Sequence, residues 1–153
     1  MSGLEWVSVI GTSVAIAAAI SSGIYALFQR QWSKEAKRRD EYLDLKKRME
    51  NILTLTIQYP YLEDESITET WKDNMHSLDE KHMRYNQFCC VLYNFLSDLY
   101  EFYNGDRAQI EKFVDIKTWV RVHRQIWENP LDPNEIPDGY TPEFRNYINT
   151  YLH

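Results

Sequence analysis

The feature that most constrains this chain is a run of 23 residues, 6–28, without a charged side chain: WVSVIGTSVAIAAAISSGIYALF. A helix needs about 20 apolar residues to cross the hydrocarbon core of a bilayer. A secretory signal peptide carries its basic residues before the apolar run. Here only Glu5 precedes the run, and five basic residues follow it within 30–39. The pattern therefore predicts a transmembrane helix rather than a signal peptide.

The charges around this run predict the orientation of the chain. Because basic residues mark the cytoplasmic side, the N-terminus is expected outside and the C-terminal part in the cytoplasm, in an inner (plasma) membrane. Trp6 at one end, and Tyr25 and Trp32 at the other, suit the aromatic belts of a membrane span. We expect a transmembrane helix at 1–29, a basic juxtamembrane segment at 30–39 and a cytoplasmic helical domain at 40–153.

The predicted span sorts its residues by size. At 100° per residue, small side chains gather on one face and large ones largely on the other. Gly11, Ala15, Ala19 and Gly23 form a small-xxx-small series, which allows helices to approach closely. The face is wider than a dimer seam requires, so it favours a homo-oligomeric ring over a dimeric tether. The residues expected to contact other subunits or line a pore are Ser8, Gly11, Thr12, Ala15, Ala19, Ser22 and Gly23, with Glu5 at the outer mouth.

The rest of the chain predicts helices alone. One helix runs from 32 to 59 and stops before Pro60. A short helix near 67–76 follows a capping box of Ser66 and Glu69. Two longer helices are expected at 82–103 and 106–127, and a last one begins at Thr141-Pro142. The class is therefore all-α, with a bundle of about four helices. The expected core stripes are Leu45, Met49, Ile52 and Thr56; Phe88, Val91, Leu92, Phe95, Leu99 and Phe102; Ile110, Phe113, Ile116, Val120, His123 and Trp127; and Phe144, Tyr147, Ile148 and Tyr151.

The charge balance narrows the range of partners. Residues 40–153 hold 12 basic and 21 acidic side chains, so this domain is a poor general binder of nucleic acid. A local basic patch could still bind a small anion. Lys117, Arg121 and Arg124 are spaced i, i+4 and i+7, which would place them on one helix face. This row is either a site for an anion or an acidic partner, or a solvated face.

Candidates for catalysis are few. His123 lies on an apolar stripe, where it is either a functional histidine or a buried one satisfied by a tyrosine or the backbone. Cys89 and Cys90 are adjacent, which disfavours a disulfide between them and fits a reducing compartment. The sequence has no metal-ligand spacing, phosphate-binding glycine loop or nucleophile motif. We therefore expect no enzyme activity, no metal and no cofactor.

The architecture resembles the small membrane proteins of bacterial antiviral systems, in particular the HEPN-like membrane accessory protein of RNA-targeting CRISPR systems. The resemblance rests on the helix at 84–103, the segment RVHRQIWENP and the terminal YTPEFRNYI. It implies a HEPN-like fold, a ring-shaped pore that depolarises the membrane, and a protein or RNA-containing effector complex as partner. The arginine and histidine spacing of a HEPN ribonuclease is not found here, so no catalytic residue is carried over.

Three functions follow as hypotheses. The first is an oligomeric membrane effector that forms a ring-shaped pore, with itself and the lipid bilayer as partners. The second is a membrane-tethered interaction module without pore activity. The third is a membrane-bound ribonuclease of HEPN type, with His123 and Arg121 or Arg124 in its site.

Overall fold

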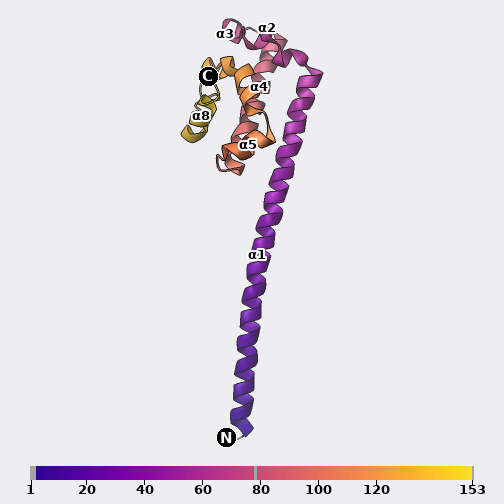
Figure 1. Cartoon of the computed structure of the whole chain (residues 1–153), viewed down its shortest axis with the longest axis vertical. Coiled ribbons are helices and arrows are strands. Elements are labelled where there is room, and N and C mark those ends of the chain that lie inside the picture. The colour runs from indigo at the N-terminus through magenta and orange to yellow at the C-terminus, as the bar shows by residue number, and fades with distance from the viewer. Residues whose placement is uncertain (1–2, 78, 153) are drawn as a thin grey trace. The chain divides into compact units, whose positions relative to one another are not determined.

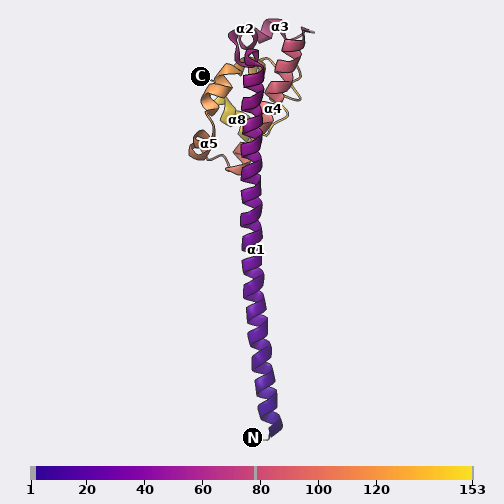
Figure 2. The same ribbon diagram turned by 90° about the vertical axis from the view of Figure 1, so that its right-hand side faces the viewer.

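A computed structural model describes the backbone of residues 3–77 and 79–152, and the side chains of residues 22, 23, 25–77 and 79–152. Over the described residues the chain is all-helical and forms no strand, as its sequence predicts. Two compact units make up the chain, Met1–Leu43 and Asp44–His153. Figures 1 and 2 show the helices of the second unit, in which the long helix α4 (Glu80–Phe102) lies together with several short ones.

The first helix, α1, spans Gly3–Gln58 without a break, so the N-terminal run and the segment after it form one helix. Tyr59 leaves the helical region with a φ of −129°. It precedes Pro60, and the ring of a proline disfavours helical backbone angles at the residue before it. Where side chains are described, no helix is long and apolar enough to cross a membrane. The span predicted at residues 6–28 falls largely outside those side chains. The predicted contact residues outside them are Glu5, Ser8, Gly11, Thr12, Ala15 and Ala19.

The region after α1 consists of a 3-10 helix, Pro60–Glu63, and two one-turn helices, α2 at Glu65–Thr68 and α3 at Trp71–Asn74. The predicted capping box was wrong. Asp64 is the N-cap of α2, and its carboxylate accepts a hydrogen bond of 2.8 Å from the backbone N–H of Ser66. Trp71 is buried, and its Nε1 donates to the carbonyl oxygen of Asn129 at 2.9 Å. This contact joins α3 to the end of α7, Arg124–Glu128.

The helix α4, Glu80–Phe102, carries much of the core. The predicted stripe is confirmed at four positions but wrong at Val91, which is 49% exposed. Asn104 and Gly105 end the helix region with φ values of 50° and 73°. The N–H of Gly105 donates to the carbonyl of Tyr100, and a Cβ at this glycine would lie 3.0 Å from the Tyr100 ring. The buried residues of α4 are Tyr85, Phe88, Cys89, Leu92, Tyr93, Phe95, Leu96 and Leu99.

The single helix predicted at 106–127 was wrong. The structure has three helices there: α5 at Arg107–Phe113, α6 at Ile116–Val122 and α7 at Arg124–Glu128. Val114 is extended, with φ −141° and ψ 154°, and Asp115 then caps α6 by accepting from the N–H of Thr118. His123 forms the junction between α6 and α7, with φ −103° and ψ 19°. These breaks turn the chain twice within a stretch whose apolar spacing is helical throughout.

The last helix, α8, spans Pro142–Asn149 and begins as predicted. The hydroxyl oxygen of Thr141 accepts a hydrogen bond of 3.3 Å from the N–H of Phe144, and Pro142 takes the first helical position. Phe144 and Ile148 are fully buried. They fix α8 against the core and bring the residues after it, including Tyr151, next to α5.

Candidate functional site

His123 is buried in the core of the second unit, with 1% of its surface exposed. Its Nδ1 lies 3.1 Å from the hydroxyl of Tyr85, and the ring of Phe88 meets it edge-on. Burial lowers the pKa of His123 to about 3, so the imidazole is neutral near pH 7. Of the two interpretations left open by the sequence, the geometry matches the buried histidine satisfied by a tyrosine.

Cys89 and Cys90 are both free thiols, which confirms that they form no disulfide with each other. Burial raises the pKa of both, that of Cys90 to about 11. A thiolate is the reactive form of cysteine, so neither thiol is activated as a nucleophile. Among the described residues, no group of three His, Cys, Asp or Glu side chains is placed to hold a metal ion.

The predicted row of three basic residues is divided by the break at His123. Arg124 begins α7, and its guanidinium forms an ion pair of 2.7 Å with Glu69, at the end of α2. Lys117 and Arg121 stay together on α6, where both line a groove of about 610 Å³. The structure therefore brings together two of the four residues predicted to bind an anion or partner. It places Arg124 and His123 elsewhere.

The groove lies between α5, α6 and the residues that follow α8. Its volume is that of a small-molecule site, which is commonly about 300–1,000 Å³. Its apolar part comes from residues near the α5–α6 junction, where the extended backbone of Val114 opens the chain. The lining residues are Arg107, Glu111, Lys112, Phe113, Val114, Asp115, Ile116, Lys117, Arg121, Thr150 and Tyr151.

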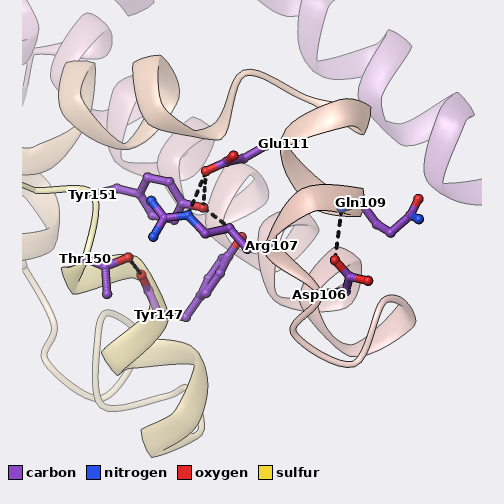
Figure 3. Close-up of polar contacts among 7 residues, drawn as sticks. All are labelled: Asp106, Arg107, Gln109, Glu111, Tyr147, Thr150 and Tyr151. Carbon is purple, nitrogen blue, oxygen red and sulfur yellow. Dashed lines mark hydrogen bonds and ion pairs between the residues drawn. The ribbon is translucent and has the colours of Figure 1, made fainter.

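One wall of the groove is a connected set of polar contacts (Figure 3). Nε of Arg107 donates to the Glu111 carboxylate at 2.8 Å, and the hydroxyl of Tyr151 donates to the same oxygen at 3.0 Å. The Arg107 guanidinium also lies over the Tyr151 ring, 4.5 Å from its centroid. The hydroxyl of Tyr147 lies 3.0 Å from that of Tyr151. These contacts hold α5 and the end of the chain together and orient Arg107.

The electrostatics of this wall follow from the same contacts. Hydrogen bonds from Arg107 and then from Tyr151 hold the pKa of Glu111 below its usual value, and the charge of Lys117 adds to the effect. Burial raises the pKa of Tyr151 well above that of a free tyrosine, so it remains a hydroxyl donor. Glu111 is thus an ionised acceptor that Arg107 and Tyr151 already bind.

Sequence reasoning missed Arg107, Glu111, Lys112 and Tyr151 as groove residues. Arg107 and Glu111 have the i, i+4 spacing of a helical ion pair, which is a weak and common signal. Tyr151 is 40 positions further along the chain, and nothing in its surroundings indicates a partner on another helix. Only the turn at residues 114–115 places these residues around one groove.

A second candidate surface lies on the first unit, where α1 carries large aromatic side chains toward solvent. Tyr25 is 64% exposed, Phe28 55% and Trp32 64%. Ser22 and Gly23, the two predicted contact residues with described side chains, are exposed as well. A Cβ at Gly23 would meet no other part of the described structure within 4 Å. An alanine is therefore accommodated at Gly23 without a clash with the described residues.

Comparison with protein families, curated proteins and solved structures finds no match to this chain.

Proposed function

We propose that this chain is an oligomeric membrane effector, anchored through residues 6–28 and able to form a ring-shaped pore in an inner membrane. The observation that carries the proposal is the order of residues along α1. An uncharged run of 23 residues ends with the exposed aromatic residues Tyr25 and Phe28. A basic segment with one further exposed aromatic residue, Trp32, follows it and contains Arg30, Lys34, Lys37, Arg38 and Arg39. This is the order expected where a span leaves the cytoplasmic face of a membrane.

The exposed aromatic residues support this proposal physically. Phe28 and Trp32 contact each other, with ring centroids 6.4 Å apart, yet both stay more than half exposed. Large aromatic surfaces in water cost free energy, and burying them at a headgroup layer recovers it. The basic residues of 30–39 would then face the cytoplasmic headgroups. On this account α1 is a membrane helix that continues directly into the helical domain.

Oligomerisation is proposed from the small-residue face of the same helix. Gly11, Ala15, Ala19 and Gly23 would let neighbouring helices approach closely, and Ser8, Thr12 and Ser22 would add hydroxyl groups to the contact. In a ring each helix touches two neighbours, which accounts for a face wider than one dimer seam. The proposal also includes a role in antiviral defence and a HEPN-like fold. Both rest on the architectural resemblance alone.

The test is the mass of the full chain in detergent, measured by light scattering with the detergent mass subtracted. We expect one discrete assembly well above a dimer, and release of a trapped dye from liposomes that contain it. The double variant Gly11→Leu, Gly23→Leu should lose both properties, because leucine keeps the helices apart. Val14→Leu, on the other face of the helix, is the matched control and should keep both.

Other outcomes select the other functions. A monomer or dimer that releases no dye would contradict the pore and favour the tethered interaction module. Cleavage of RNA by the purified full chain would favour the membrane-bound ribonuclease. The burial of His123 weighs against that last outcome, because an imidazole with 1% exposure does not reach an RNA substrate.

A further inference from the structure

We propose that the groove between α5, α6 and the end of α8 binds a phosphate-bearing small molecule. The groove lies entirely within Asp44–His153, and the proposal does not depend on the membrane function proposed above. Three observations carry it: the sign of the charge that lines the groove, the contacts that already occupy its carboxylates, and its size.

The charge of the groove is opposite to that of its domain. Four of the 12 basic residues of 40–153 line it, but only two of the 21 acidic residues do. A domain with this excess of acidic residues would place mixed or negative charge in an arbitrary surface depression. A local positive charge on a negative domain concentrates small anions while the surrounding surface repels them. The basic lining residues are Arg107, Lys112, Lys117 and Arg121.

The two carboxylates of the groove already have partners within the fold. Glu111 accepts hydrogen bonds from Arg107 and Tyr151, and Asp115 caps α6 by accepting from the N–H of Thr118. Lys117 lies near enough to lower the pKa of both carboxyl groups. Even so, Lys112 and Lys117 form no ion pair within 4.0 Å in the described part of the chain. Both ammonium groups therefore remain available to a ligand.

The chemistry of the basic groups suits a phosphate group in particular. Lysine binds phosphate as a point charge, and arginine can bind two of its oxygens at once. Arg107 is held in place by the Tyr151 ring and Glu111, so a ligand that meets it meets an oriented group (Figure 3). The half-buried ring of Phe113 and the side chain of Thr150 add an apolar surface and a hydroxyl group beside these charges.

Size and surroundings favour a small molecule over a nucleic acid. A volume of about 610 Å³ accommodates one compact ligand. A polymer would have to extend its other phosphates over a domain that carries 21 acidic side chains. Nucleic-acid binding needs a continuous basic surface along the backbone, because each neutralised phosphate releases a counterion. The groove supplies one local cluster of positive charge instead.

The experiment measures the binding of pyrophosphate to the full chain by isothermal titration calorimetry, in a nonionic detergent and at low salt. We expect saturable binding at one site per chain that weakens as salt is added. The double variant Lys112→Gln, Lys117→Gln should bind about tenfold more weakly or worse, because it loses two charge-assisted contacts. Lys72→Gln is the matched control. Lys72 is an exposed lysine of α3 outside the groove, and this variant should bind as the wild type does.

A second arm separates a soluble ligand from a lipid headgroup. The full chain is placed in neutral vesicles with and without phosphatidic acid, and pyrophosphate binding is measured again. An unchanged affinity identifies a soluble phosphate compound as the natural type of ligand. A weaker apparent affinity with phosphatidic acid, absent in the double variant, identifies a lipid headgroup. The proposal is overturned if wild type binds no pyrophosphate, or if the double variant with unchanged helical content binds it as tightly.

Discussion

His123 illustrates how the surroundings of one side chain decide its chemistry. Its position on an apolar stripe left a functional and a structural interpretation open. The core around it decides between them, because Tyr85 lies 3.1 Å from Nδ1 and Cys89 Sγ lies 3.8 Å from it. The hydroxyl of Tyr93 donates to the backbone carbonyl of His123 at 3.2 Å. The neutral imidazole of His123 and the backbone carbonyl of the same residue thus connect α4 to the junction of α6 and α7.

The burial of His123 predicts a pH dependence of stability. The unfolded chain takes up a proton at this residue near pH 6.5, whereas the folded chain does so only near pH 3. The unfolded state therefore binds more protons between these values, and stability falls as the pH falls below about 6.5. The expected slope of the free energy of unfolding approaches about 1.4 kcal/mol per pH unit. Urea denaturation at a series of pH values measures it.

The variant His123→Gln is the control for this slope, because glutamine is polar and does not titrate. The comparison is made between about pH 5 and 6.5, above the range in which carboxyl groups titrate. The variant should be less stable at pH 7 but lose less stability on acidification than wild type. Equal slopes in the two proteins would show that His123 takes up its proton over the same pH range in the folded and the unfolded chain, contrary to its burial.

At the scale of elements, the one-turn helix α2 depends on a cap that the sequence pattern assigned to the wrong residue. Ser66 and Glu69 fit a capping box, but Ser66 lies inside α2 and Asp64 caps it. Asp64→Ala should therefore lower the free energy of unfolding by about 0.5–2 kcal/mol. Ser66→Ala, the matched control, should change it by less than about 0.5 kcal/mol. Urea denaturation measures the free energy of unfolding of both variants. A larger loss for Ser66→Ala than for Asp64→Ala would show that Ser66, as in the predicted capping box, is the cap.

The division of 106–127 into three helices has a local and a tertiary cause. Aspartate is a preferred N-cap residue, so Asp115 gives a helix start at this point a sequence signal. The junction at His123 has none, since no glycine or proline lies between Asp106 and Asn129. That turn is held by the contacts of His123 and Tyr93 with the core. The predicted burial of the apolar stripe is confirmed at Ile110, Ile116 and Val120. It holds despite the breaks because each short helix buries its own part of the stripe.

At the scale of the whole molecule, the described core belongs to the second unit. Its first residues are Leu45 and Ile52 of α1, which are 4% and 2% exposed. A chain that begins at residue 40 should therefore fold, with the same cooperative thermal unfolding as the helical domain of the full chain. Circular dichroism measures both. A truncated chain that melts without cooperativity would contradict the division into two units.

Neighbouring positions on α1 provide a sharper test within the truncated chain. Ile52→Ala removes a buried side chain and should cost about 2–5 kcal/mol. Leu53→Ala changes the next residue, which is 40% exposed, and should cost less than about 1 kcal/mol. Equal costs would mean that this turn of α1 does not pack against the core. Denaturant unfolding of the two variants gives the difference directly.

The sequence by itself determined the helical class and the positions of the clearest helix boundaries. Apolar spacing, Pro60, Asn104-Gly105 and Thr141-Pro142 act locally, because proline and glycine restrict or free the backbone wherever they occur. The same local reasoning predicted the core face of α4, apart from Val91. The predicted membrane span is also a property of sequence alone, since it depends on length and the absence of charge, and it stays a prediction.

Only the tertiary structure decided which side chains meet. Arg107 and Tyr151 are far apart in sequence but in contact, because the chain turns at Val114 and the residues after α8 lie next to α5. The structure separates Arg124 from Lys117 and Arg121, since a turn at His123 breaks the helix that would have aligned them. Periodicity in sequence reports which face of a helix is apolar. The groove depends instead on where the helices stop, and the contacts of the folded core determine that.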